Sequence, residues 1–201
     1  MKYPDAAKQL LRDTLLDAAG ALMRDRPWAK VTMAEVARVA GVSRQTVYNE
    51  FGGRRELGQA YVLREGDRFI AEVEAVIEAH PDAPRVALAR AFETFLAAAQ
   101  DNPLVAAIAG REGGEELLAL VTVHGGALID GARDRLAGRL VRTWPQAGVQ
   151  DAAVVADCLV RLAISHATLP SGPAPETAAA VARVLGPLVD ELVGGPTLMP
   201  R

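Results

Sequence analysis

The stretch from Thr32 to Leu57, TMAEVARVAGVSRQTVYNEFGGRREL, constrains the fold most, because it contains the start signals of two short helices. Thr32 and Glu35 have the spacing of a capping box, in which a hydroxyl accepts a backbone N–H and a carboxylate bonds back. Ser43 is a residue type preferred at the N-cap of a second helix. Gly41 lies between them and is free to take the positive φ of a sharp turn. Two capped helices joined by a short glycine turn predict a helix-turn-helix.

The predicted second helix, which follows Ser43, sorts its side chains onto different faces. Val47 and Phe51, four residues apart, are expected to point into the core, and polar residues form the outward rows. Those rows carry a guanidinium, two carboxamides, a phenol and hydroxyls, which are groups that bind base edges and phosphates. DNA binding is therefore favoured over a helical hairpin with an ordinary solvated face. The candidate DNA-binding residues are Thr32, Ser43, Arg44, Gln45, Thr46, Tyr48, Asn49 and Arg54.

The same stretch resembles the DNA-binding domain of the TetR/AcrR family of bacterial transcriptional regulators over roughly residues 8 to 68. The matching residues are Thr32, Val36, Ala37, Ala40, Gly41, Val42, Ser43, Thr46, Tyr48, Phe51, Arg54 and Leu57. The resemblance implies that Tyr48 and Arg54 hold phosphates and that the second helix enters the major groove. Gln45 stands where the family often has glycine, and its long carboxamide favours base reading there. Residues 48–70 look like a subgroup of actinobacterial regulators of alkane or lipid metabolism.

Composition and charge agree with this hypothesis. Half of the 201 residues are apolar but only 4% are aromatic, so the core must be built from Ala, Leu and Val in closely packed helices. The net charge of −3 on the whole chain hides an uneven distribution. Residues 1–64 hold 11 Lys/Arg and 7 Asp/Glu, a balance of +4, whereas residues 65–201 hold 11 and 18, a balance of −7. A positive N-terminal part orients that part toward phosphate.

The fold class expected is all-α, with about nine helices in two domains. Residues 8–68 form the expected helix-turn-helix domain, and residues 69–201 the C-terminal ligand-binding and dimerisation domain. A long helix that follows Arg54 and Arg55 and runs to about Ala79 begins in one domain and ends in the other. Proline and glycine breaks separate the other helices, which are expected at 5–25, 84–100, 104–109, 115–144, 150–169 and 175–193.

Two further sites are expected in the C-terminal domain. The helices 150–169 and 175–193 are rich in small residues and are expected to pair with their copies in a homodimer. An apolar pocket between the helices 84–109, 115–144 and 150–169 is expected to bind a small apolar effector, such as an acyl chain or hydrocarbon. Close helix packing and surface or paired polar groups are the alternatives. The candidate lining residues are Phe92, Phe95, Leu104, Ile108, His124, Leu128, Arg161, Ile164 and His166.

The function expected is a ligand-responsive repressor that binds palindromic operator DNA as a homodimer. The resemblance implies the mechanism, in which the effector shifts the long helix and changes the separation of the recognition helices. The alternative is a helical small-molecule sensor or carrier that acts through a protein partner instead of DNA. No catalytic motif, metal-ligand spacing or cofactor signature is found, so an enzyme is disfavoured. The lone Cys158 and the lack of a long uncharged apolar run favour a cytoplasmic protein without a membrane span.

Overall fold

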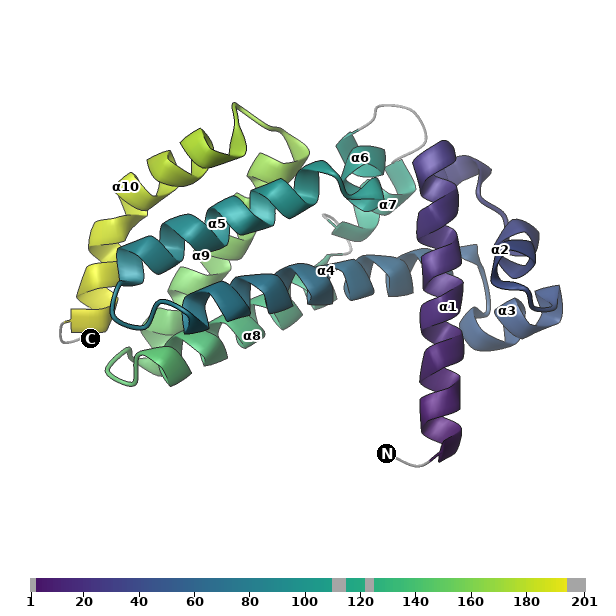
Figure 1. Cartoon of the computed structure of the whole chain (residues 1–201), viewed down its shortest axis with the longest axis horizontal. Coiled ribbons are helices and arrows are strands. Elements are labelled where there is room, and N and C mark those ends of the chain that lie inside the picture. The colour runs from purple at the N-terminus through teal and green to yellow at the C-terminus, as the bar shows by residue number, and fades with distance from the viewer. Residues whose placement is uncertain (1–2, 110–114, 122–124, 195–201) are drawn as a thin grey trace. The chain divides into compact units, whose positions relative to one another are not determined.

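The computed structural model describes residues 3–109, 115–121 and 125–194 (Figure 1). All regular secondary structure in these ranges is helical, which confirms the predicted all-α class. The elements are α1 (Tyr3–Asp25), the short 3-10 helix η1 (Trp28–Lys30), α2 (Met33–Ala40), α3 (Arg44–Phe51), α4 (Arg54–Glu78), α5 (Pro84–Gln100), α6 (Pro103–Ala109), α7 (Glu115–Val121), α8 (Gly126–Thr143), α9 (Val149–Thr168) and α10 (Ala174–Gly194).

The chain forms two compact units, and helix α4 contributes to both. The first unit contains Met1–Glu65 and Pro103–His124, and the second contains Gly66–Asn102 and Gly125–Arg201. This grouping differs from the expected division into residues 8–68 and 69–201, because α6 packs against α1 and α7 packs against α6. The short helices α6 and α7 are therefore part of the unit that contains the helix-turn-helix.

The first unit has a core to which α1, η1, α2, α3 and α4 all contribute. Its largest buried side chains include Leu15, Trp28, Val36, Val47 and Tyr61, none of which is more than 2% exposed. Helix α1 packs on α2, and α2 packs on α3, as expected for a three-helix DNA-binding arrangement. Burial of these side chains holds the helix-turn-helix against the other helices of the first unit, because separation of the helices would expose apolar surface to water.

The caps of α2 and α3 confirm the predicted boundaries. The Glu35 N–H donates to Thr32 Oγ1 at 3.3 Å, and the Thr32 N–H donates to Glu35 Oε2 at 3.1 Å, which completes the capping box. Gly41 has φ 70° and Gly52 has φ 80°, so both helices end on a glycine with positive φ, and Gly41 takes the left-handed helical conformation. Hydrogen bonds from Thr32 lower the pKa of Glu35. The ionised Glu35 carboxylate therefore stabilises the fold, and this contribution is lost as the pH falls through the lowered pKa.

The second unit pairs its helices in two sets: α10 packs along α5, and α9 packs along α8. Its core contains many alanines, including Ala87, Ala152 and Ala156, each fully buried, as the shortage of aromatic residues predicts. Trp144 is one of the few large core side chains, and its indole N–H donates to the carbonyl oxygen of Pro81 at 2.6 Å. That bond satisfies the polar atom of a side chain that is 3% exposed.

A series of ion pairs joins the C-terminal half of α4 to α8. Arg135 contacts Glu74 at 2.5 Å and Asp67 at 3.1 Å, and Arg139 contacts Glu78 at 3.3 Å. The Glu74 carboxylate, whose side chain is 12% exposed, needs such a partner because an unpaired charge at low exposure is costly. These pairs hold the two helices in one register alongside the apolar contacts between them.

One predicted helix is wrong. The segment from Glu115 to about Trp144 was expected to be a single helix, but the described residues form α7 and α8, and Gly125 is the N-cap of α8. Glycine is a poor helix former, and two in succession at 125 and 126 favour a helix start over a helix interior. The described part of the chain therefore contains ten α-helices instead of about nine.

Candidate nucleic-acid interface

Helix α3 presents two parallel rows of polar side chains at the surface. Arg44 donates to the Tyr48 hydroxyl at 3.3 Å, and its guanidinium lies 5.3 Å from the centre of the Tyr48 ring. Gln45 Nε2 donates to Asn49 Oδ1 at 2.8 Å. Both contacts join residues four apart, which are neighbours on a helix surface. The outward face of α3 thus carries hydrogen-bonding side chains that are paired with one another along the helix.

The hydroxyls predicted to meet DNA already have roles in helix capping. The Ser43 hydroxyl accepts the Thr46 N–H at 3.1 Å and lies 2.8 Å from the Thr46 hydroxyl. The Thr32 hydroxyl donates to Glu35 at 2.8 Å. A hydroxyl has one donor and two acceptor lone pairs, so these groups keep some capacity for another partner. Their contacts with DNA remain predictions.

The inner face of α3 is anchored by a contact that the sequence did not reveal. Val47 and Phe51 are buried, as predicted, with 0% and 6% exposed. In addition, Arg12 of α1 donates to Glu50 at 2.8 Å, and its guanidinium lies 4.8 Å from the centre of the Phe51 ring. The Glu50 side chain is only 9% exposed. Because Arg12 and Glu50 are 38 residues apart, no local pattern indicates their pairing.

Arg54 is bound within the first unit and does not extend freely from it. One terminal nitrogen donates to the Trp28 carbonyl oxygen at 3.0 Å, and the other donates to Glu116 of α7 at 2.5 Å. The guanidinium also lies 5.5 Å from the centre of the Trp28 ring. The Glu116 carboxylate accepts the Trp28 indole N–H at 3.1 Å. The predicted phosphate contact of Arg54 remains a prediction, but its surroundings now include a competing carboxylate.

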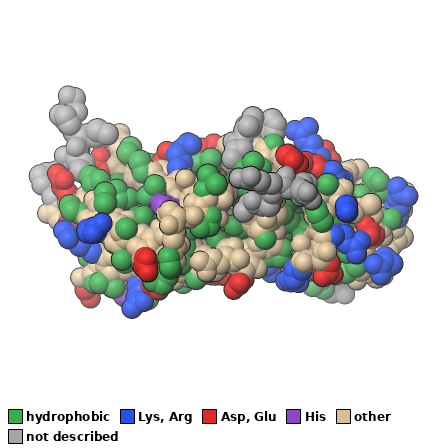
Figure 2. Space-filling model, turned by 90° about the horizontal axis from the view of Figure 1, so that it is seen from above, with side chains coloured by type: hydrophobic (Ala, Val, Ile, Leu, Met, Phe, Trp, Pro, Cys, Tyr) green, Lys and Arg blue, Asp and Glu red, His purple; other side chains and the backbone are tan. Residues whose placement is uncertain are grey.

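The charge distribution supports the placement of the interface on the first unit. In Figure 2, Lys and Arg side chains are most frequent at the end of the view where Figure 1 shows α1, α2 and α3. This agrees with the balance of +4 for residues 1–64. The whole first unit, which also contains Glu65 and residues 103–124, has a balance of only +1, so the positive charge belongs to its N-terminal part. Positive charge on α1, α2 and α3 favours association with a polyanion, since phosphate contacts supply much of the affinity of proteins for DNA.

The residues predicted to line an effector pocket are only partly brought together. Phe92 of α5 and His166 of α9 meet edge to face, with ring centres 6.0 Å apart. Leu104 and Ile108 belong to α6, in the first unit, and are buried there. The other apolar candidates are second-unit residues, namely Phe95, Leu128 and Ile164, all half-buried. His124 lies outside the described residues.

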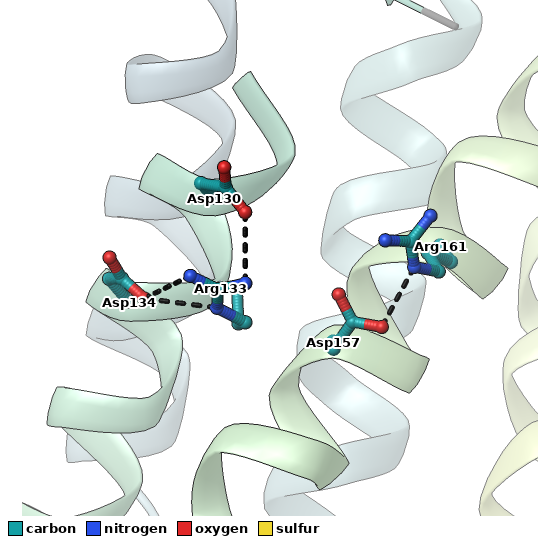
Figure 3. A network of polar contacts seen from close by, with 5 residues as sticks. All are labelled: Asp130, Arg133, Asp134, Asp157 and Arg161. Carbon is teal, nitrogen blue, oxygen red and sulfur yellow. Dashed lines mark hydrogen bonds and ion pairs between the residues drawn. The ribbon is translucent and has the colours of Figure 1, made fainter. Parts of the chain in front are cut away.

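Arg161 lies at the surface instead of lining a buried site. Its guanidinium donates to Asp157 at 2.8 Å, and its side chain is 59% exposed (Figure 3). The bond lowers the pKa of Asp157 and raises that of Arg161. On α8, Arg133 forms a similar group with Asp130 and Asp134. Both clusters are ion pairs of a solvated helix face.

The described residues form neither a metal site nor a membrane span. Within them, no group of three or more His, Cys, Asp or Glu side chains is placed to hold a metal ion. None of the helices in the described ranges has the length and hydropathy needed to cross a membrane. Cys158, the single cysteine of the sequence, is an exposed residue of α9.

A capped helix-turn-helix with a polar outer helix, followed in the same polypeptide by a separate helical unit, is the arrangement of a class of DNA-binding regulators. Comparison with known families gives the same class. Residues 15–61 match the model of bacterial regulatory proteins of the tetR family, and residues 83–187 match the C-terminal domain of the bacterial tetracyclin repressor. The chain belongs to the TetR family of bacterial transcriptional regulators, whose members act as regulators and not as enzymes.

Two relatives match nearly the full chain. The HTH-type transcriptional regulator AlkX of Mycobacterium tuberculosis is 37% identical over 188 residues, which cover 94% of this chain and 89% of the relative. The crystal structure of the TetR family repressor AlkX from Dietzia sp. strain DQ12-45-1b, implicated in biodegradation of n-alkanes, is 34% identical. It superposes with a TM-score of 0.81 over 90% of this chain and 96% of that one.

Replacement of Arg12 by alanine tests the anchor of α3. The change leaves the Glu50 carboxylate without its cation, so the free energy of unfolding should fall by about 1–3 kcal/mol. Arg24→Ala is the matched control, because it removes an exposed arginine from the same helix. Urea unfolding followed by circular dichroism measures both. An equal, small effect of the two variants would contradict the anchoring role of Arg12.

Proposed function

We propose that this regulator is a repressor that binds a palindromic operator as a homodimer and is released by an apolar effector. The observation that carries the DNA-binding part is the outward face of α3, where the Arg44–Tyr48 and Gln45–Asn49 pairs lie exposed beside each other. The helix is held from behind by Val47, buried in the core of the first unit. A helix of this kind fits the major groove of B-DNA, with its polar residues toward base edges and phosphates.

Gln45 is proposed to read a base. Its Nε2 has two N–H donors, and Asn49 accepts from only one of them, so a donor and the Oε1 acceptor remain for adenine N7 and N6. The bond to Asn49 also restricts the carboxamide before DNA arrives, which lowers the entropy lost on binding. Arg44, Tyr48 and Thr46 are proposed to contact neighbouring bases or phosphates.

Selection of bound sequences from a random pool of duplex DNA tests this proposal. We expect the parent protein to select a palindrome and Gln45→Ala to lose its preference at one symmetric position of each half-site. The lost contact corresponds to roughly 1–3 kcal/mol of discrimination. Gln9→Ala is the control, because Gln9 makes the same type of contact to a residue four positions on, at 3.1 Å to Asp13, but in α1. An identical motif for Gln45→Ala and its parent would refute the base contact.

Helices α9 and α10 are proposed to form the dimer interface. Although α9 and α10 pack mainly on other helices of the second unit, each exposes large apolar side chains. Val154 of α9 is 48% exposed, and Val184 and Leu188 of α10 are 67% and 42% exposed. Val184 and Leu188 lie four positions apart, on one row of α10. Exposed apolar side chains grouped on one helix row are a common mark of an interface.

Val184→Glu tests the interface without disturbing the protomer, because the valine is mostly exposed in the single chain. In a dimer the carboxylate would be buried without a partner, at a cost of several kcal/mol. Light scattering should show a dimer for the parent and a monomer for the variant. Val39→Glu, at a valine of α2 that is 43% exposed, should stay dimeric. A dimeric Val184→Glu variant would place the interface elsewhere.

The effector is proposed to be a hydrocarbon or fatty acyl chain bound in the second unit among α5, α8 and α9. Phe92 and His166 form one aromatic pair there, and Phe95 of α5 forms another with Phe69 of α4, with ring centres 5.3 Å apart. Leu128 and Ile164 supply further half-buried apolar surface. The implication of the Dietzia relative in n-alkane biodegradation supports the same class of ligand. Leu104, Ile108, Arg161 and His124 are not part of this proposed site.

Thermal melting with a series of n-alkanes and fatty acids tests the effector class. A bound ligand should stabilise the protein by about 2.7 kcal/mol at a hundredfold excess over Kd and should release DNA. His166→Phe keeps an aromatic ring beside Phe92 but removes the polar nitrogens. If His166 holds a carboxylate, the variant should lose the response to fatty acids and keep that to alkanes. A response to polar metabolites alone would eliminate the apolar site.

A further inference from the structure

Glu116 is the one acidic side chain in the described part of the chain that contacts both Arg54 and Trp28. We infer that Glu116 is a positioning residue that restrains Arg54 and limits the positive charge that Arg54 offers to the phosphates of bound DNA. The inference rests on the proposed operator binding, and it assigns to α7 a direct influence on the affinity for DNA. Sequence patterns did not indicate it, because Arg54 and Glu116 are 62 residues apart.

Arg54 lies where it can bind a phosphate of DNA that contacts α3. It is the first residue of α4 and follows the end of α3 after only Gly52 and Gly53. Its side chain is 35% exposed, so a phosphate that approaches α3 can reach it. A guanidinium has five N–H donors, and the contacts with Trp28 and Glu116 leave others for a further acceptor.

A carboxylate and a phosphate compete for the same cation. Arg54 and Glu116 form an ion pair at 2.5 Å with side chains 35% and 34% exposed, so the pair is accessible to solvent and of modest strength. When DNA arrives, the carboxylate both occupies an N–H of one terminal nitrogen of the guanidinium and repels the phosphates. With Glu116 in place, Arg54 should therefore contribute less than one full phosphate contact.

Contacts with Trp28 allow the charge of Glu116 to be removed while Arg54 stays in place. The Trp28 carbonyl oxygen, at 3.0 Å, and the Trp28 ring, 5.5 Å from the guanidinium, continue to hold Arg54 when the carboxylate is removed. Glu116→Gln keeps an oxygen that can accept the Trp28 indole N–H, which is important because the Trp28 side chain is fully buried. The substitution removes the negative charge and retains the local geometry. Its expected result is tighter binding to DNA.

The test is the salt dependence of binding to a duplex of random sequence, measured by filter binding for the parent and for Glu116→Gln. One full phosphate contact makes the slope of log affinity against log salt steeper by about 0.9, so the part of a contact that the variant gains should steepen it by at most about 0.9. The advantage of the variant over its parent should therefore fall by up to about threefold between roughly 50 and 200 mM salt. Glu115→Gln is the matched control, because it removes the same charge from an exposed position in the same turn of α7.

Combination with Arg54→Gln shows whether the effect passes through Arg54. In that background, Glu116→Gln should leave the slope unchanged. The inference is overturned if Glu116→Gln has the slope of Glu115→Gln, if it binds DNA more weakly, or if its steeper slope persists without Arg54. Melting curves accompany each variant, and Glu116→Met, of similar length and uncharged, replaces Glu116→Gln if that protein is unfolded. A parent that binds no duplex refutes the proposed function itself, whereas a binding parent with matching variants refutes only the role of Glu116.

Discussion

Both compact units depend on one 25-residue helix, α4, whose buried side chains are divided between two cores. Leu57 and Tyr61 belong to the core of the first unit, and Ile70 and Ile77 belong to that of the second. Between these two sets lies Gly66, where an added Cβ would overlap the side chain of Leu128. A residue that breaks α4 would therefore remove apolar contacts from both cores, and even alanine at position 66 would require Leu128 to move.

In both units, ion pairs link elements that are distant in sequence. In the second unit, carboxylates of α4 are paired with arginines of α8, and the exposed clusters around Arg133 and Arg161 are self-contained. In the first unit, two arginines bridge elements that are distant in sequence: Arg12 ties α1 to α3, and Arg54 ties η1 to α7. The net charge of a segment indicates only whether that segment attracts or repels phosphate. The effective charge at the proposed interface depends on which arginines are already neutralised.

Sequence alone predicted the features that depend on neighbouring residues. The capping box at Thr32, the N-cap at Ser43 and the inward face of α3 need only a few consecutive side chains, and all are present as expected. The missed features depend on chain segments that meet only after folding. The Arg12–Glu50 and Arg54–Glu116 pairs, and the packing of α6 with the first unit, have no local signature. The glycines at 125 and 126 were visible, but glycine inside a helix and glycine at its start give the same local pattern.

The two tryptophans of the sequence are buried, and each belongs to a different unit. The Trp28 indole is bonded to Glu116 and the Trp144 indole to Pro81, so each ring has a defined polar partner and is shielded from water. Indole emission changes when such a ring meets solvent. The chain therefore carries one natural optical probe in each unit, and proteins with a single tryptophan would show whether the two units lose their structure together or one after the other.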